Sequence, residues 1–415
     1  MAYRRIPLSA LRVGMHVAKL DRSWFRTPLL FFSFHVKTTR QIEKLRRYGI
    51  KEVEIDPSRG RDIADQTDSP ATVGNSNDCP TRQTPRANQV ASLETLLQDL
   101  AVAREARQRL EQSIRSTFSS IAATGVVEPD ETRRISIEVI SVTQTLPKPA
   151  LLMAFSHERE EDPFLSQHAL AVSGLSMILA HAADFDLLRL QTLVTGALLH
   201  DIGLLQLPAD LRRRCHETSG SLSFRQQQLY RSHPRLAAMA LQRQGSFSPS
   251  ICQMVADHHA LLNNTGFPVE TPGAFTTDMT RLLMVADRYD ELLTGFGGAS
   301  PLTPHQALQR LYEEGQAGKY DMSYVALFVT VLGIYPVYSC VKLNTGERAV
   351  VTVINSRKLH QPIVTITHDT EGTPYPVSLV IDLANQDERA PIRSITTILE
   401  SDFDVFQNPA HSADR

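Results

Sequence analysis

The chain has 415 residues, of which 42% are hydrophobic and 21% are charged, and its formal net charge is −2. This composition is typical of a soluble globular protein with two or three domains. The balanced charge argues against a nucleic-acid polymer as a partner. The four cysteines form no CxxC pair, which argues against a zinc knuckle or a disulfide framework and favours a reducing, cytoplasmic location. The most apolar late run, YVALFVTVLGIYPVY, is too short and too interrupted by Gly333 and Pro336 to span a membrane.

Residues 1–56 are predicted to form a small N-terminal α+β domain. The segment GMHVAKL predicts a strand, TTRQIEKLRRYG predicts a helix that Gly49 ends, and IKEVEID alternates like another strand. Residues 57–88 are rich in Pro, Ser, Thr, Asn and Asp and poor in large apolar side chains. This composition predicts a flexible linker.

Long connecting helices are predicted for residues 89–146. The first carries apolar side chains at alternating steps of three and four, interrupted by Arg107 and Thr117: Leu93, Leu96, Leu100, Ala103, Leu110, Ile114 and Ile121. Such a stripe belongs either to a helix packed on the next domain or to a coiled coil that joins two chains. The packed helix is the favoured alternative, and a homodimer stays open.

In the remaining chain, the sequence pattern changes from helical to β-like near Tyr335. Residues 147–332 continue the helical pattern, with Pro, Gly and Asn at its breaks, and are predicted to form an all-helical domain. After Pro336 the segments CVKLNTGERAVVTVIN, PIVTITHD and PVSLVIDL are β-branched and alternating, so residues 333–400 are predicted to form a β-rich extension. The fold class is therefore mainly α, with a small N-terminal α+β domain and a small β-rich C-terminal extension.

Seven polar residues lie on, or at the ends of, apolar helical segments: His168, His200, Asp201, His233, His258, His259 and Asp287. Apolar helix faces normally point inward, and buried imidazoles and carboxylates cost several kcal/mol unless they are hydrogen-bonded or bind a metal. Neutral imidazole suits Fe, Mn or Zn, and a carboxylate such as Asp201 could bridge two cations. Taken singly, each histidine is more simply a hydrogen-bonded core residue, and His233-Pro234 is simply a helix start.

The motifs carrying these residues resemble the HD-GYP family, a branch of the HD phosphohydrolase superfamily. The family's HDIGK is answered by HDIGL at 200–204, its HHExxDGxGYP by HHALLNNTGFP at 258–268, and its ADxxDA by ADRYDE at 286–291. The His-Pro helix start corresponds to His233-Pro234. The match covers roughly residues 150–330. The N-terminal unit is similar to an uncharacterised domain that often precedes this family.

The resemblance implies an HD-type helical bundle with a binuclear iron or manganese centre that hydrolyses cyclic di-GMP to pGpG or GMP. One cation would take His168, His200, Asp201 and Asp287, and the other Asp201, His233, His258 and His259. Asp201 would bridge the two cations, and His200 and Asp201 are the expected catalytic residues. The loop of Gly266, Phe267 and Pro268 would contact the substrate.

Several positions depart from the family pattern. Leu204 replaces the family's Lys, the segment 292–301 has no Arg where the family has one, Ala260 replaces a Glu, and Asn263-Asn264 replace Asp-Gly. Phe267 lacks the hydroxyl of the family's Tyr, and Phe164 stands where three-metal members have a Glu, which argues against a third metal. Two missing cations weaken the stabilisation of a phosphate by several kcal/mol, or about a thousandfold in rate.

Three hypotheses follow from the sequence. The leading one is a metal-dependent phosphodiesterase for cyclic di-GMP in second-messenger signalling, slowed by the missing phosphate-binding residues. The second is a catalytically weak or inactive signalling module that binds a nucleotide or a protein partner. The third is a phosphohydrolase for another phosphoester. Complete ligand positions favour the first hypothesis, and the departures at Leu204 and at 292–301 favour the second.

Overall fold

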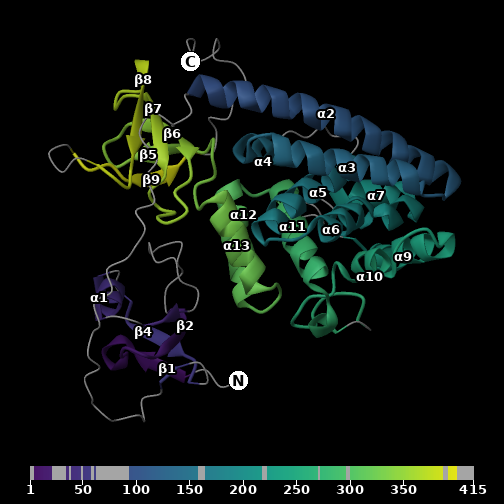
Figure 1. Cartoon of the computed structure of the whole chain (residues 1–415), viewed down its shortest axis with the longest axis horizontal. Coiled ribbons are helices and arrows are strands. Elements are labelled where there is room, and N and C mark those ends of the chain that lie inside the picture. Colours follow the sequence, from purple (N-terminus) through teal and green to yellow (C-terminus); the bar gives the residue numbers. More distant parts are fainter. Residues whose placement is uncertain are drawn as a thin grey trace. The chain divides into compact units, whose positions relative to one another are not determined.

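The computed structural model describes residues 4–20, 34–36, 39–47, 50–57, 60–61, 93–157, 164–216, 222–269, 272–295, 300–386 and 391–399. The chain divides into two compact units, one of residues 1–90 with 357–360 and one of residues 91–356 with 361–415 (Figure 1). The predicted linker at 57–88 lies almost wholly outside the described residues. The domain boundaries expected from the sequence stay predictions.

The first unit is a four-stranded antiparallel sheet with one helix. Its strand order is β1 (Arg4–Pro7), β4 (Glu52–Ile55), β2 (His16–Leu20) and β3 (Phe34–His35), with the 3-10 turn η1 (Leu8–Ala10) after β1 and helix α1 (Thr39–Arg47) before β4. Val17, Val53 and Ile55 point into a core that also holds Leu45 of the helix. The α+β prediction is confirmed for this unit, with β2, α1 and β4 in the segments expected from the sequence.

The second unit is mainly helical, which confirms the fold class (Figure 1). Its helices are α2 (Leu93–Thr124), α3 (Pro129–Thr145), α4 (Lys148–His157), α5 (Phe164–Ala182), α6 (Leu187–Leu199), α7 (Ala209–His216), α8 (Phe224–Arg231), α9 (His233–Gln244), α10 (Pro249–Asp257), α11 (Asp278–Thr294), α12 (Pro304–Gln316) and α13 (Met322–Leu332), with 3-10 turns η4 (Ile202–Gln206) and η5 (Gly273–Phe275). Helix α5 is central, because every residue from Ser166 to Ala180 is buried. None of the described helices is long and apolar enough to cross a bilayer.

The long helix α2 packs along α3, α4 and α5 of its own chain (Figure 1). The stripe expected from the sequence is buried there, at Leu96, Leu100, Ala103, Leu110, Ile114 and Ile121. Arg107 interrupts the stripe without leaving an uncompensated buried charge, since its guanidinium lies 3.4 Å from the carboxylate of Glu111. The packed-helix alternative therefore accounts for the stripe within one chain.

A five-stranded antiparallel sheet follows the helices. Its order is β8 (Pro374–Asp382), β7 (Ile363–His368), β6 (Arg348–Val353), β5 (Cys340–Leu343) and β9 (Ile395–Ile398). Alternate residues of each strand point into one core, as the period of two in a strand requires; examples are Val341 in β5, Val351 in β6 and Val364 in β7. The predicted β-rich extension is confirmed. The hydroxyl of Tyr338, just before β5, donates to the carbonyl of Leu96 in α2 at 2.8 Å.

Candidate metal centre

The seven residues predicted from the sequence come from five helices and meet at one place in the second unit. His168 lies in the first turns of α5 and Asp287 in the middle of α11, whereas the others stand at helix ends: His200 and Asp201 between α6 and η4, His233 at the start of α9, and His258 and His259 after α10. Six of the seven are buried, and the His259 side chain is 15% exposed. Five of the seven side chains thus stand where a helix begins or ends.

One group contains His168, His200, Asp201 and Asp287. The Nε2 atom of His168 lies 3.2 Å from Oδ1 of Asp287 and 3.5 Å from Oδ2 of Asp201. The Nε2 atom of His200 lies 3.6 Å from each of the same two oxygens. Two imidazole nitrogens and two carboxylate oxygens thus surround one point, an arrangement that could hold a divalent cation.

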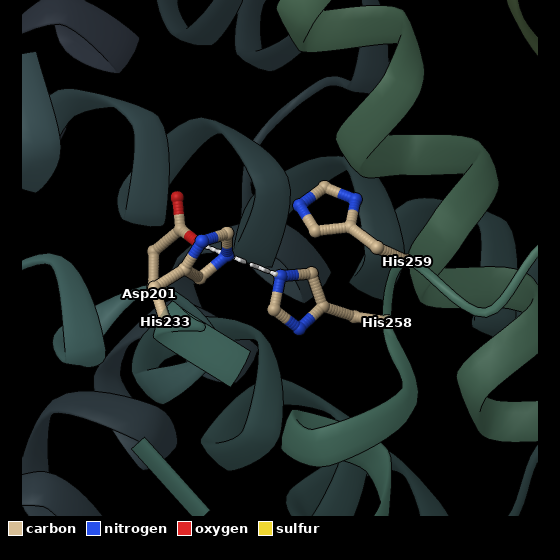
Figure 2. A group of neighbouring side chains, drawn as sticks. All are labelled: Asp201, His233, His258 and His259. Atoms are coloured by element: carbon tan, nitrogen blue, oxygen red, sulfur yellow. Dashed lines mark hydrogen bonds and ion pairs between the residues drawn. The ribbon is translucent and has the colours of Figure 1, made fainter. Parts of the chain in front are cut away.

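The second group contains Asp201, His233, His258 and His259, whose side chains converge in Figure 2. The Nε2 atoms of His233 and His258 lie 3.0 and 3.4 Å from Oδ1 of Asp201. The His259 ring packs against the rings of both other histidines, with centroids 4.2 Å from His258 and 5.2 Å from His233. This group could hold a second cation.

Asp201 belongs to both groups and presents a different oxygen to each. Its Oδ2 faces His168 and His200, and its Oδ1 faces His233 and His258. Within the described chain Oδ1 is buried and accepts no hydrogen bond. A buried carboxylate oxygen without a donor is costly, and a cation would stabilise it. The geometry of Asp201 therefore fits a carboxylate that bridges two cations.

Backbone hydrogen bonds fix the tautomers of three histidines. Each of them uses Nδ1 at 2.7 Å from a carbonyl three residues earlier: His200 to Ala197, His233 to Tyr230 and His258 to Val255. A carbonyl only accepts, so Nδ1 carries the hydrogen and Nε2 of the neutral ring presents a lone pair to the centre. His233 and His258 then bring two such Nε2 atoms within 3.1 Å of each other. Two facing lone pairs repel unless a positive species lies beside them, which fits a cation.

His168 is oriented by a carboxylate instead. Its Nδ1 donates to Oδ2 of Asp290 at 2.7 Å, and Asp290 is fully buried one turn after Asp287 in α11. Burial lowers the pKa of His168, but the carboxylates of Asp287 and Asp290 raise it by more, to well above its usual value. A proton and a cation therefore compete for Nε2. In the sequence Asp290 is one more carboxylate on a helix, and no local pattern indicates this positioning role.

Replacing Asp290 by alanine is expected to lower the affinity for divalent cations about 10- to 100-fold, because the outer partner of a ligating histidine sets its tautomer and orientation. Titration of metal-free protein with Mn(II) measures the effect. Asp290→Asn keeps an acceptor for Nδ1 and should restore part of the affinity. Asp278→Asn, at an exposed position of the same helix, is the matched control. Equal affinities for Asp290→Ala and the wild-type protein would contradict the role.

The protonation states of four ligand positions favour cations. Burial raises the pKa of Asp201 and Asp287, but the neighbouring imidazoles lower both by more, so both pKa values lie well below the usual range. Burial lowers the pKa of His258 and His259. Ionised carboxylates and neutral imidazoles are the forms in which these side chains bind metals. At two other buried positions, His168 and His200, burial lowers the pKa but the nearby carboxylates raise it by more.

Glu291 joins the rim of the centre, a feature that sequence reasoning missed. Its carboxylate lies within 4.8 Å of ligand atoms of His259 and Asp287. Burial and the charge of Asp287 raise its pKa to about 7, although Arg288 pulls it downward. The only sequence signal is the spacing of four from Asp287, which places both on one helix face. Arg288 donates to Glu291 at 2.9 Å and to Glu314 at 2.8 and 3.0 Å.

The loop after His259 folds back onto the centre. The amide of Phe267 donates to the carbonyl of His259 at 3.0 Å, and the two ring centroids are 4.5 Å apart. A Cβ at Gly266 would lie 2.0 Å from the same carbonyl, so only glycine permits the close approach. Asn264 takes a φ of 61°, a conformation that asparagine tolerates well. The expected substrate loop of Gly266, Phe267 and Pro268 therefore lies beside the second group.

Two of the departures from the family pattern pack together. Leu204 is buried with Leu207, Leu211 and Cys215, and Phe164 and Tyr230 pack against this cluster. The Phe164 ring also stacks on His168, with centroids 5.8 Å apart. Leu204 and Phe164, which stand at the positions of the family's Lys and third-metal Glu, thus form one apolar wall. Within the segment 292–301, which has no Arg, residues 296–299 lie outside the described residues.

Comparisons with known proteins find similarity along most of the chain. Residues 159–324 match the HD domain family, and residues 3–132 match a domain of unknown function (DUF3391). The chain is 26% identical over 390 residues to the cyclic di-GMP phosphodiesterase PA4108 of Pseudomonas aeruginosa, covering 93% of this chain and 91% of that protein. It is 25% identical over 189 residues to a cyclic di-GMP phosphodiesterase of Vibrio cholerae, covering 43% and 37% of the two chains.

Among solved structures, Bd1817, an HDG"Y"P protein from Bdellovibrio bacteriovorus, aligns with a TM-score of 0.46 at 18% identity, over 80% of this chain and 99% of that chain. The match to the HD domain family spans every residue of the two groups, from His168 to Asp287. With the matching motifs and the similarity to PA4108 over nearly its whole length, the chain is an HD-GYP-like protein with an HD domain.

Proposed function

We propose that this protein is a metal-dependent phosphodiesterase that hydrolyses cyclic di-GMP. One observation carries the proposal: Asp201 presents its two carboxylate oxygens to two separate histidine groups. A pair of divalent cations, Fe or Mn in this proposal, suits such a shared ligand set. The names of the relatives from Pseudomonas aeruginosa and Vibrio cholerae support the choice of substrate.

The residues of the centre would have distinct roles in metal binding, water exclusion and substrate contact. His168, His200 and Asp287 would hold one cation, His233, His258 and His259 the other, and Asp201 both. Bound divalent cations supply an acidified water and stabilise negative charge on phosphoryl oxygens. The apolar wall of Leu204 and Phe164 would exclude bulk water from one side of the centre. The loop of Gly266, Phe267 and Pro268 would contact the substrate on another side.

We expect slow turnover, to pGpG or on to GMP. Leu204 supplies no charge near the first group, and the guanidinium of Arg288 is already held by Glu291 and Glu314. Charge-assisted hydrogen bonds to a phosphate are worth about 1.5–3 kcal/mol each, so the loss of two cations lowers the rate by about a thousandfold.

The test is a product assay. Protein loaded anaerobically with Fe(II) or with Mn(II) is incubated with cyclic di-GMP, and the products are separated by chromatography. We expect metal-dependent formation of pGpG or GMP that chelation abolishes. If metal-loaded protein forms neither product above the chelated control, the proposal is wrong.

The second candidate is a signalling module that binds a cyclic dinucleotide or a protein partner without useful turnover. The burial of Leu204 in an apolar cluster favours it, because no ammonium faces a substrate phosphate from that position. Equilibrium binding of cyclic di-GMP to metal-loaded protein, with no product after long incubation, would select this alternative. Turnover of other phosphoesters alone would instead indicate a phosphohydrolase of different specificity.

A further inference from the structure

A cationic side chain near the centre would stabilise a bound dianionic dinucleotide further, and Leu204 does not provide one. This inference rests on the proposed function, because the substrate class comes from it. Several arginines lie near the centre in sequence, and most are already engaged. Arg288 is held by two carboxylates, Arg212 donates to the carbonyls of Leu205 and Leu207 at 2.9 and 3.1 Å, and Arg213 pairs with an aspartate.

Arg235 follows His233 by two residues in α9. Residues two apart on a helix point in nearly opposite directions, and the imidazole of His233 points into the centre. The Arg235 side chain is exposed and therefore directed away from the centre. It is a suitable control and a poor candidate.

Arg231, the last residue of α8, has a different position. Its guanidinium carbon lies 5.9 Å from the centroid of the Phe267 ring, in the loop beside His259. Arg231 is exposed, and within the described ranges its guanidinium forms no ion pair with any carboxylate. A weak cation–π contact leaves the charge available to an anion.

Contacts of Tyr230, the preceding residue, determine the position of the Arg231 backbone. The carbonyl of Tyr230 accepts the hydrogen bond from Nδ1 of His233, and the Tyr230 ring packs into the apolar cluster that contains Leu204. The Tyr230 ring also meets the Phe267 ring edge to face, with centroids 6.1 Å apart. These contacts place the backbone of Arg231 close to both the second histidine group and the substrate loop.

We propose that Arg231 binds a phosphate of the cyclic dinucleotide, in place of the cation missing at Leu204. Its guanidinium lies beside the Phe267 ring, which packs on the ring of His259, whereas Leu204 belongs to the apolar wall. A planar guanidinium offers two parallel donors to a phosphate, which a lysine does not. Arg231 is thus a substrate-binding residue, with no part in holding the metals.

The test compares Arg231→Ala and Arg231→Lys with Arg225→Ala and Arg235→Ala in metal-loaded protein. Arg225 is an exposed residue at the opposite end of the same helix α8. For Arg231→Ala we expect the KM for cyclic di-GMP to rise about tenfold, with kcat changed less than about threefold and an unchanged metal content. Arg231→Lys should recover part of the affinity, and both control variants should match the wild type.

A second readout separates this inference from the proposed function. The Kd for cyclic di-GMP is measured at several salt concentrations, whether or not the wild-type protein turns it over. Arg231→Ala should bind about tenfold more weakly and with a shallower dependence on salt, because one phosphate contact is lost. A Kd and salt dependence equal to those of Arg225→Ala would overturn the inference. Failure of turnover with a weakened Kd would overturn only the proposed hydrolysis.

Discussion

Replacing Asp201 by asparagine is expected to remove both cations together and to lower kcat/KM for cyclic di-GMP by about a thousandfold or more. The physical reason is that one carboxylate serves two groups, with Oδ2 toward His168 and His200 and Oδ1 toward His233 and His258. Asparagine keeps the shape but has no negative charge and one oxygen only, so it cannot bridge two cations. A thousandfold loss corresponds to about 4 kcal/mol of transition-state stabilisation.

Metal analysis and the product assay, made on the same preparation, measure this effect. Asp210→Asn is the matched control, because Asp210 is exposed in nearby α7 and pairs only with Arg213 within the described part of the chain. Circular dichroism establishes that the Asp201 variant is folded. A folded Asp201→Asn protein that retains two cations per chain would rule out the bridging role.

The elements with strong periodicity could be predicted from the sequence. The alternating strands in the first unit and in the C-terminal sheet, and the stripe of α2, bury the side chains that their spacing indicates. The short strands β1, β3 and β9 were not predicted, because their sequences RRIP, FH and ITTI show no alternation of apolar and polar residues. Their strand pairing depends on neighbours distant in sequence.

The centre could be predicted as a set of residues, since the motifs place polar side chains where apolar helices end. Which oxygen of Asp201 faces which histidine depends on the packing of five helices, and no local pattern encodes it. Asp290 and Glu291 illustrate the same limit. Both are helix carboxylates in the sequence, yet one orients His168 and the other lies at the rim near His259.

The departures from the family pattern show a further limit of sequence reasoning. A missing Lys at Leu204 and a missing Glu at Phe164 are separate losses in the sequence. In the fold they belong to one apolar cluster, together with the ring of Tyr230. The adjacent position, Arg231, then becomes meaningful only because the ring of Phe267 lies beside its guanidinium. Function at this centre is therefore best tested by variants that change one side of it at a time.

Gly203→Ala is expected to disturb the second histidine group from outside the ligand set. A Cβ at Gly203 would lie 2.0 Å from the carbonyl oxygen of His233 and 2.9 Å from the amide nitrogen of Ala237, and neither backbone atom can move without α9. Helix α9 must then shift and carry His233 away from Oδ1 of Asp201, now 3.0 Å distant. We expect the metal content to fall from two cations per chain to one, and kcat/KM to fall at least about a hundredfold.

The control lies at the other end of the same helix. Gly245 has a φ of 68°, and a Cβ there would meet no atom within 4 Å. Gly245→Ala should therefore cost about 1 kcal/mol of unfolding free energy through backbone strain, while leaving both cations bound. Thermal unfolding and metal analysis of the two variants separate a general loss of stability from a displaced ligand. Two cations retained in Gly203→Ala would mean that α9 adapts without moving His233, and the second group would then not depend on this close approach.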